Sequence, residues 1–342
     1  MKAISLQAIG QVRLVDLPVP EPADDQLLIR TAASTICTSD LNDIRANPFG
    51  TPLPVVLGHE AAGSVAAVGR AVRSFAPGER VATHPVHPCL QCSECRAGRA
   101  HLCPDMKHFG LNMQGTFAEY YLVRADRARR LPAAVPWHVA ALAEPLCVCL
   151  QALAQSRVAA GGSLLIIGDG PFGLIMARLA ARLRLGRLVL AGGEEFRLGH
   201  AGAATTLNVT RVAAPREALA RLLPEHGCDA AIVAVGAAEA IAWGTHLVRP
   251  KGRVVLFAGI PGLTPVDLFG VHLRELELVG ANNDEDRFDE AVALLDDRQL
   301  ALADLVTHCL PWQRYDEALE LAAHRHDVAL KVALLWNPEE PP

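Results

Sequence analysis

Side chains that bind metals occur at three separated places in the first half of the chain. Cys37 is followed two residues later by Ser39, His59 and Glu60 are adjacent, and Glu144 stands just before a proline. A thiolate, an imidazole and a carboxylate are donors that zinc accepts in sites that keep one position open for chemistry. Glu60 can ligate the metal or orient a ligand from behind it. Ser39 would place a hydroxyl beside the metal, where it could pass on a proton from a bound alcohol.

Each of these residues also has a simpler structural explanation when it is taken alone. A buried Cys37 before a Ser/Asp turn, a hydrogen-bonded His59 in a core and an acidic Glu144 at a helix N-terminus are all common. The stretch around His59 argues for more, because the apolar residues 55–57 run into a glycine turn at Gly58. A buried strand that ends in such a turn presents the next polar pair, His59 and Glu60, at its end.

Four cysteines follow at the spacing Cys89-x2-Cys92-x2-Cys95-x7-Cys103. Four thiolates so close together can surround one tetrahedral ion as a closed site, whose role is folding rather than chemistry. An iron–sulfur cluster also uses four thiolates, but nothing else in the sequence indicates electron transfer. We therefore predict a structural zinc in the lobe of residues 89–103. The total of nine cysteines is odd, which favours metal binding in a reducing compartment over a disulfide framework.

A glycine-rich loop opens the second half of the chain. Residues 164–167, Leu-Leu-Ile-Ile, have the pattern of a buried parallel strand, and they lead into the sequence Gly168-Asp169-Gly170-Pro171-Phe172-Gly173. The first glycine makes the turn, the second lets a pyrophosphate approach the backbone, and the third lets helix and strand pack closely. A helical pattern follows at 174–185, so the phosphate would lie at a helix N-terminus. In this strand–turn–helix context the motif predicts dinucleotide binding, with the residues from Gly168 to Gly173 as candidates.

The choice between NAD and NADP should be decided at the end of the next strand. An acidic residue about 20 positions after the motif would hold the adenosine ribose of NAD, but the sequence has Gly192 and Gly193 there, followed by Glu194 and Glu195. Glycine removes the acidic barrier to the 2′-phosphate of NADP, whereas the two glutamates would repel it. Arg197 could pair with a phosphate or be an ordinary solvated helix residue. The sequence favours NAD and leaves NADP open, with Gly192 and Arg197 as further cofactor-binding candidates.

Strand and helix patterns alternate through the second half, as a doubly wound parallel sheet requires. The strand-like runs are 188–191, 230–235, 254–258 and 276–280, and the helical patterns include 216–223 and 237–248. After residue 280, amphipathic helices are expected at 287–296 and 315–323 and a last strand at 329–336. Residues 1–35 have the pattern of short antiparallel strands. The sequence thus predicts an α/β protein that joins a doubly wound sheet to a mostly-β part.

The composition excludes several classes of protein. The 342 residues are enough for two domains, and 51% hydrophobic with 20% charged residues allow a substantial core. A formal net charge of −5 argues against nucleic acid or an anionic membrane surface as the main partner. We expect no apolar stretch of membrane-spanning length and no secretory signal in the N-terminal residues. These observations predict a cytoplasmic protein.

Together these motifs resemble the zinc-dependent medium-chain dehydrogenase/reductase family, in its polyol and threonine dehydrogenase branch. The resemblance rests on five motifs in order, namely residues 37–40, residues 58–63, the four-cysteine lobe, Glu144-Pro145-Leu146 and the glycine-rich loop. It implies a GroES-like catalytic domain made from residues 1–145 and 284–342. A Rossmann domain at 146–283 would be inserted between them. It also implies homodimers or homotetramers.

The resemblance further implies a catalytic zinc on Cys37, His59 and either Glu144 or Glu60, with the last position left for water or substrate. The metal would lower the pKa of the alcohol by stabilising the alkoxide, and hydride would pass from the carbinol carbon to the nicotinamide ring. Ser39 would relay the proton outward.

Two departures from the family pattern bear on this proton relay. Thr38 replaces the usual glycine, and Asn42 stands where many relatives carry the histidine that ends the relay. An amide cannot take up a proton near neutral pH. Water or another group must then do so, or Ser39 is less important than the resemblance implies.

The expected reaction is the reversible oxidation of a secondary alcohol of a polyol, sugar acid or cyclitol to a ketone, with two zinc ions and NAD(P). The alternatives within enzymes are an L-threonine 3-dehydrogenase and an aminocyclitol dehydrogenase of secondary metabolism. A nucleotide-binding relative without activity is the alternative outside catalysis. Such a relative should have lost its zinc ligands, and the retention of Cys37, His59, Glu60 and Glu144 argues against it.

Overall fold

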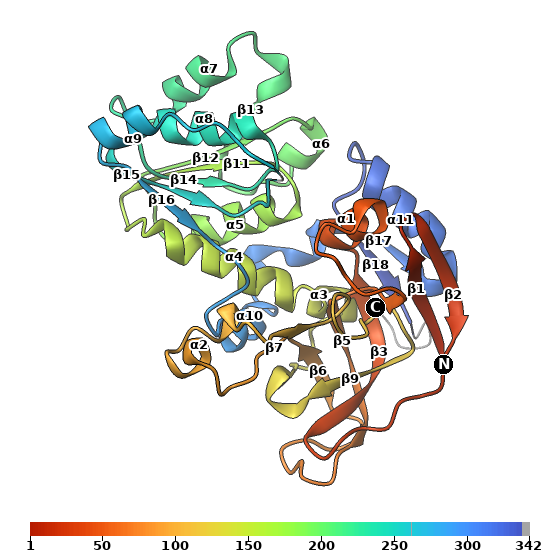
Figure 1. The fold of residues 1–342 in the computed structure, drawn as a ribbon. Helices are drawn as coiled ribbons and strands as arrows, with labels where there is room; N and C mark the ends of the chain where they lie inside the picture. The colour runs from red at the N-terminus through yellow and green to blue at the C-terminus, as the bar shows by residue number, and fades with distance from the viewer. Residues whose placement is uncertain (261, 337–342) are drawn as a thin grey trace. The chain divides into compact units, whose positions relative to one another are not determined.

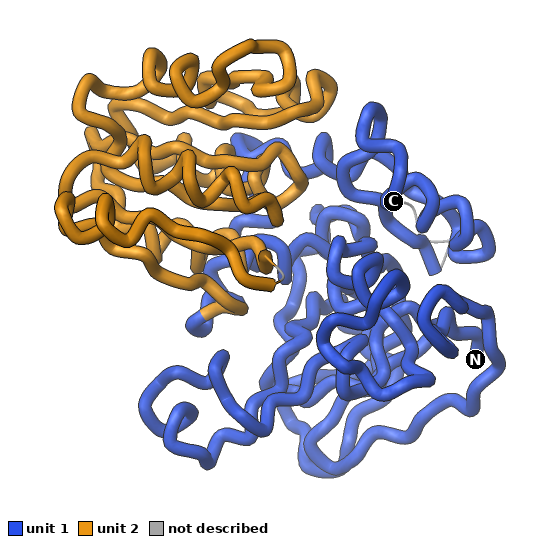
Figure 2. The backbone as a smooth tube through the Cα atoms, turned by 45° about the horizontal axis from the view of Figure 1, so that its top comes forward, with its two compact units in different colours: residues 1–147, 285–342 blue, residues 148–284 orange. Residues whose placement is uncertain are grey.

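The computed structural model describes residues 1–260 and 262–336, which divide into two compact units. Unit 1 consists of Met1–Cys147 and Glu285–Pro342, and unit 2 of Val148–Asp284 (Figure 2). Both ends of the chain therefore belong to unit 1, and unit 2 is an insertion in its sequence.

Unit 1 is mostly β-structure. Its strands are β1 (Lys2–Ala8), β2 (Gln11–Asp16), β3 (Gln26–Thr35), β4 (Val55–Val56), β5 (Glu60–Val68), β6 (Arg80–Thr83), β7 (Val86–His87), β8 (Lys107–His108), β9 (Tyr120–Arg124), β10 (Ala128–Arg130), β17 (Val306–Pro311) and β18 (Lys331–Leu335). Its helices are α1 (Thr38–Ala46), α2 (Ser93–Arg96), α3 (Trp137–Ala140), α10 (Phe288–Leu294) and α11 (Tyr315–His324). Short 3-10 turns connect several of these elements, at Ala100–Leu102, Ala125–Arg127, Arg298–Leu300, Leu302–Leu305 and Trp312–Arg314.

The largest sheet of unit 1 joins the two ends of the chain. Among the described residues its strand order is β10-β6-β5-β3-β18-β17, and β9 also pairs with β3. The C-terminal strand β18 thus lies beside β3, with Thr35 paired to Glu60 on one side and to Ala333 on the other. This register brings the end of β3, the beginning of β5 and β18 to the same place. The strands enclose an apolar core that includes Ile29, Val65 and Val123.

Unit 2 contains the predicted doubly wound sheet. Its strands are β11 (Ser163–Ile167), β12 (Arg187–Gly192), β13 (Thr205–Asn208), β14 (Cys228–Val233), β15 (Val248–Leu256) and β16 (Glu277–Gly280). They are all parallel, in the order β13-β12-β11-β14-β15-β16. This order reverses beside β11, where open α/β sheets bind their ligands. The sequence analysis did not anticipate β13, whose residues are half exposed and lack an apolar run.

Helices cover both faces of this sheet. They are α4 (Ala143–Ser156), which begins in unit 1, α5 (Pro171–Ala181), α6 (Glu195–Leu198), α7 (Pro215–Leu222), α8 (Ala238–Leu247) and α9 (Leu268–Leu273), with a 3-10 turn at Val209–Arg211. Figure 1 shows α7 and α8 on one face and α4 and α5 on the other. The core beneath α7 and α8 includes Leu165, Val189, Leu219 and Ile241. The fold class predicted from the alternating pattern is therefore confirmed.

One expectation about apolar segments was wrong. The helical stretch Trp137–Ser156 has 20 residues and a mean hydropathy of 1.4, which is long and apolar enough to cross a membrane by length and composition. However, 78% of its apolar window is buried within the protein. It is a core helix, and its apolar character comes from packing on several sides at once.

Candidate active site

The three predicted zinc ligands Cys37, His59 and Glu60 come together in unit 1. One donor atom of each lies within 4.8 Å of the donor atoms of the other two, and all three side chains are buried. The predicted strand end is confirmed, since β4 ends at Val56, Gly58 turns with a φ of 88° and Glu60 begins β5. A side chain on Gly58 would also overlap the ring of Phe117, so this turn requires glycine.

Asp40 holds this turn against the first helix, a role that the sequence analysis missed. Its Oδ2 atom accepts a hydrogen bond of 2.9 Å from the Cys37 amide, and its Oδ1 atom accepts one of 3.1 Å from the Gly58 amide. Oδ1 also lies 3.4 Å from Nδ1 of His59, which leaves Nε2 of that ring for a metal. Asp40 stands at the third position of a helix that begins after Cys37, and this capping-box position was a signal in the sequence.

The second residue that was missed is Lys331, at the beginning of β18. Lys331 is 1% exposed, and its ammonium group forms an ion pair with both oxygens of Glu60, at 2.6 Å to Oε2. The hydroxyl of Thr35 also donates to Oε2 of Glu60. Burial by itself would lower the pKa of Lys331, but the Glu60 carboxylate and the Cys37 thiolate outweigh it and raise that pKa. A lysine inside an apolar strand needs such a buried carboxylate partner.

Glu144 lies in the first turn of α4 and is 8% exposed. The close group of donor atoms consists of Cys37, His59 and Glu60, and Glu144 is not a member of it. The negative charge of Glu144 nevertheless acts on this site, because it helps to raise the pKa of Lys331. Of the two carboxylates that the sequence left open, Glu60 is thus the one grouped with the thiol and the imidazole.

Ser39 and His108 lie beside this group, and Asn42 follows Ser39 in the first helix. The Ser39 hydroxyl is 3.4 Å from Nε2 of His59, which places it beside the predicted metal position. The Asn42 amide oxygen accepts a hydrogen bond from Arg45. The ring of His108 lies 5.4 Å from the His59 ring, and its pKa is lowered to about 3 by burial and by the charge of His59. His108 is therefore a neutral imidazole, and the sequence analysis did not single it out.

The donor set fits a zinc ion. Sulfur, imidazole nitrogen and carboxylate oxygen, supplied by Cys37 and by the adjacent pair His59 and Glu60, match the ligands of a catalytic site with an open position. Without a metal, burial alone would lower the pKa of His59, but Asp40 and Cys37 outweigh it and raise that pKa. The site therefore favours a positive charge among its three donors. Cys37, His59 and Glu60 would hold the zinc, and the metal would act there as a Lewis acid.

The Lys331–Glu60 pair gives a testable stability prediction. Lys331→Met keeps most of the side-chain length but leaves the Glu60 carboxylate buried without its cation. Breaking a buried ion pair in this way costs about 3–5 kcal/mol, so we expect the melting temperature of unit 1 to fall by about 6 °C or more. The melting temperatures of wild type and variant are measured by differential scanning calorimetry on chelator-treated protein.

The matched control for this prediction is Lys331→Met combined with Glu60→Gln, which removes both charges and should recover part of the loss. Added zinc should also reduce the loss if Glu60 is a ligand, because the metal would replace the missing cation. A melting temperature unchanged in the single variant would contradict the role given to Lys331.

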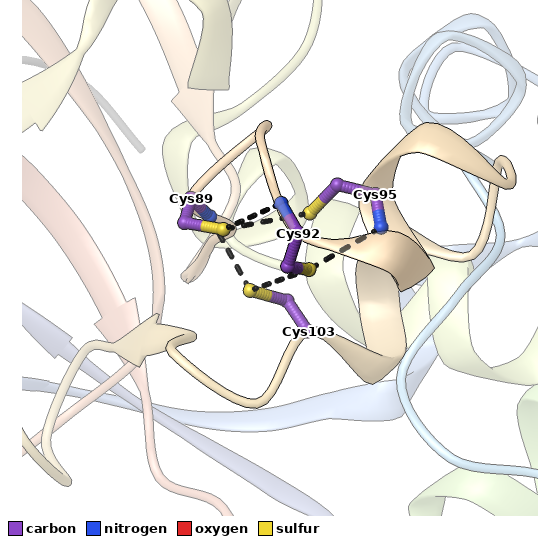
Figure 3. Close-up of side chains that lie close together, drawn as sticks. All are labelled: Cys89, Cys92, Cys95 and Cys103. Carbon is purple, nitrogen blue, oxygen red and sulfur yellow. Dashed lines mark hydrogen bonds between the residues drawn. The ribbon is translucent and has the colours of Figure 1, made fainter.

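The four cysteines of the lobe face one another, as Figure 3 shows. All four sulfur atoms lie within 4.8 Å of each other, with 4.0 Å between Cys89 and Cys95 and 3.8 Å between Cys92 and Cys103. A tetrahedral zinc with bonds of about 2.3 Å sets its sulfur atoms about 3.8 Å apart. Backbone amides donate to three of the sulfurs at 3.4 Å, namely those of Cys89, Cys92 and Cys103. The predicted closed thiolate site fits this geometry.

The thiols of the lobe do not ionise equally without a cation. The backbone amide of Gln91 lowers the pKa of Cys89 to about 7, whereas desolvation raises that of Cys95 to about 12. A divalent cation is needed to make all four sulfurs thiolates near neutral pH. The lobe also buries little apolar surface, since Leu90 and Leu102 are 55% and 47% exposed.

In unit 2, the glycine-rich loop has the geometry that the motif predicts. Gly168 directly follows β11 with a φ of 124°, and a side chain on Gly173 would overlap the carbonyl oxygen of Gly168. A side chain on Gly170 would meet nothing within 4 Å, so this is the open side of the loop. Gly170 is the N-cap of α5 and Pro171 its first residue. The free amides of this helix end can hold a pyrophosphate.

A cavity of about 170 Å³ lies beside this loop. It is lined by the loop residues Gly168 and Asp169, by the end of β12 and by apolar side chains from neighbouring elements, among them Val209, Val235, Ala240 and Trp243. Gly192, a predicted cofactor-binding residue, lines it as well, whereas Arg197 and Phe172 are not among its lining residues. The size and apolar walls suit one nucleoside rather than a whole dinucleotide.

Comparison with protein families agrees with both units. Residues 23–133 match the alcohol dehydrogenase GroES-like domain, and residues 171–297 match the zinc-binding dehydrogenase family. The chain is 33% identical over 318 residues to D-altritol 5-dehydrogenase of Agrobacterium fabrum, covering 91% of this chain and 93% of that protein.

Solved structures of similar proteins carry either nicotinamide dinucleotide. A protein of Sinorhizobium meliloti bound to NADP, described as a zinc-binding dehydrogenase, has a TM-score of 0.91 and 28% identity, covering 98% of this chain and 99% of its own. An Escherichia coli alcohol dehydrogenase in complex with NADH has a TM-score of 0.91 and 25% identity over the same shares. The choice of dinucleotide must therefore lie in the residues of each chain.

Proposed function

Since the chain belongs to the zinc-containing medium-chain alcohol dehydrogenase family, we propose that it reversibly oxidises a secondary alcohol of a polyol, sugar acid or cyclitol to a ketone. The family makes it a zinc-dependent dehydrogenase of the polyol type with a GroES-like domain and a Rossmann sheet. The particular substrate is the proposal, and it is supported by the similarity to the protein named D-altritol 5-dehydrogenase.

The observation that carries this proposal is the buried group of Cys37, His59 and Glu60, which offers one sulfur, one nitrogen and one oxygen donor. A structural site would be closed by four protein ligands, as the lobe of residues 89–103 is. Here three donors leave a position for a substrate oxygen. Glu60 is the third ligand in this proposal, and Glu144 keeps a second carboxylate near it.

When bound, zinc would polarise the substrate hydroxyl and the dinucleotide would accept the hydride. The chain's own residues orient and hold these groups. Asp40 fixes the His59 ring through Nδ1 and so keeps its Nε2 directed at the metal position. Ser39, whose hydroxyl is 3.4 Å from that nitrogen, receives the proton of the substrate hydroxyl. Because the Asn42 amide is neutral and binds Arg45, water rather than residue 42 carries this proton onward.

A substrate screen tests the proposal. The zinc-loaded protein is given polyols, sugar acids, cyclitols, aminocyclitols and L-threonine with NAD and with NADP, and reduced cofactor is followed by its absorbance. We expect turnover on a hydroxylated secondary alcohol and two zinc ions per chain by elemental analysis. Turnover of L-threonine or an aminocyclitol alone would favour the corresponding alternative. Bound dinucleotide without any turnover would favour the non-catalytic relative.

A further inference from the structure

The end of β12 has no room for the acidic side chain that usually selects NAD. A Cβ atom on Gly192 would overlap the Cβ, Cγ and Oδ2 atoms of Asp169. Asp169 belongs to the glycine-rich loop, 23 positions earlier in the chain. Its carboxylate therefore occupies the space into which a side chain at position 192 would extend.

Two hydrogen bonds hold the Asp169 carboxylate in this place. Its Oδ2 atom accepts from the amides of Gly193 and Glu194, at 2.8 and 2.7 Å. Asp169 also lines the cavity of about 170 Å³. The carboxylate is thus fixed by the backbone at the wall of this cavity.

We propose that Asp169 accepts a hydrogen bond from the adenosine ribose of the cofactor and so selects NAD over NADP. The inference rests on the proposed use of a nicotinamide dinucleotide. In other dinucleotide-binding sheets, an acidic residue at the end of the strand after the glycine-rich loop binds this ribose. Here a residue of the glycine-rich loop itself would take that role. Gly192 is then required because any side chain there would displace Asp169.

The surrounding charges favour the same choice. A 2′-phosphate would meet the carboxylate of Asp169, and Glu239 lines the same cavity. The one nearby cation that the sequence offered is Arg197, which is half-buried. The carboxylates of Asp169 and Glu194 already attract it, although burial lowers its pKa. A dianionic phosphate would therefore compete with two carboxylates for one guanidinium group.

Direct binding measurements test this inference without any turnover. NADH and NADPH are titrated into the wild-type protein and into Asp169→Asn, with cofactor fluorescence as the readout. Asparagine keeps an oxygen that can accept from Gly193 and Glu194 but removes the charge. We expect the wild type to bind NADH about tenfold or more tightly than NADPH, and Asp169→Asn to reduce this preference about tenfold or more.

The matched control is Glu225→Gln, which removes an exposed charge of unit 2 that does not line the cavity and should leave the ratio of the two dissociation constants within about threefold of the wild-type ratio. Gly192→Asp should weaken binding of both cofactors because its side chain displaces Asp169. Equal binding of NADH and NADPH by the wild type, or an unchanged ratio in Asp169→Asn, would overturn the inference and leave the proposed function standing. Binding of neither cofactor would overturn the proposed function, and this inference with it.

Discussion

Replacing Cys37 with serine is expected to reduce turnover on the order of 10³-fold or more while the protein stays folded. Cys37 provides the sulfur donor of the three-residue group, and a serine hydroxyl is a poor ligand for zinc near neutral pH. Loss of the metal removes several kcal/mol of stabilisation from the developing alkoxide, which corresponds to this loss of rate. Elemental analysis of Cys37→Ser should give one zinc per chain instead of two.

The control for Cys37→Ser is Cys309→Ser, because Cys309 is an exposed thiol of β17 outside both cysteine sites. It should keep two zinc ions and wild-type turnover. Circular dichroism of Cys37→Ser should match the wild type, since the bonds of Asp40 to the amides of residues 37 and 58 do not involve the sulfur. Unchanged turnover, or two zinc ions in the variant, would remove Cys37 from the catalytic site.

The sequence singled out the three donor side chains that the structure groups together, but not the residues that hold them in place. Cys37 and the pair at 59 and 60 each carry a local signal, a metal-binding side chain next to a turn or a strand end. Lys331 carries no such signal, because its meeting with Glu60 depends on β18 pairing with β3, some 300 residues away in sequence. Hydrophobic patterns predict that a strand exists at 329–336 but not which strand it will join.

Because strand pairing cannot be read from the sequence, the sequence also leaves the preference for NAD or NADP open. The sequence predicts the glycine-rich loop and the end of the next strand as separate features, and the glycine at 192 then indicates a missing acid. In the structure, β11 and β12 are neighbours, and residues 167 and 191 are paired. The carboxylate at 169 therefore reaches the space above residue 192 from the adjacent strand end. Only the pairing of these two strands shows that Asp169 can take the place of an acidic side chain at position 192.

Replacing Cys92 with serine should have a different result, namely loss of structure in the lobe of residues 89–103. Cys92 supplies one of four sulfur donors, accepts from the Cys95 amide and caps the four-residue helix α2. A structural zinc contributes about 10–16 kcal/mol in small peptides at neutral pH. Because the lobe buries little apolar surface of its own, it has no other source of comparable stability. Limited proteolysis should cut Cys92→Ser within the lobe under conditions in which the wild type is intact.

Ser93→Ala is the matched control, since Ser93 is an exposed neighbour in α2 without a sulfur atom. It should keep two zinc ions and resist the protease as the wild type does. Cys92→Ser and Cys37→Ser should each lose one zinc ion, but only Cys92→Ser should gain a cleavage site within the lobe. This separation follows from the geometry, because four thiolates enclose one ion completely while three mixed donors leave the other open. An intact lobe and an unchanged melting temperature in Cys92→Ser would show that these cysteines do not hold a structural metal.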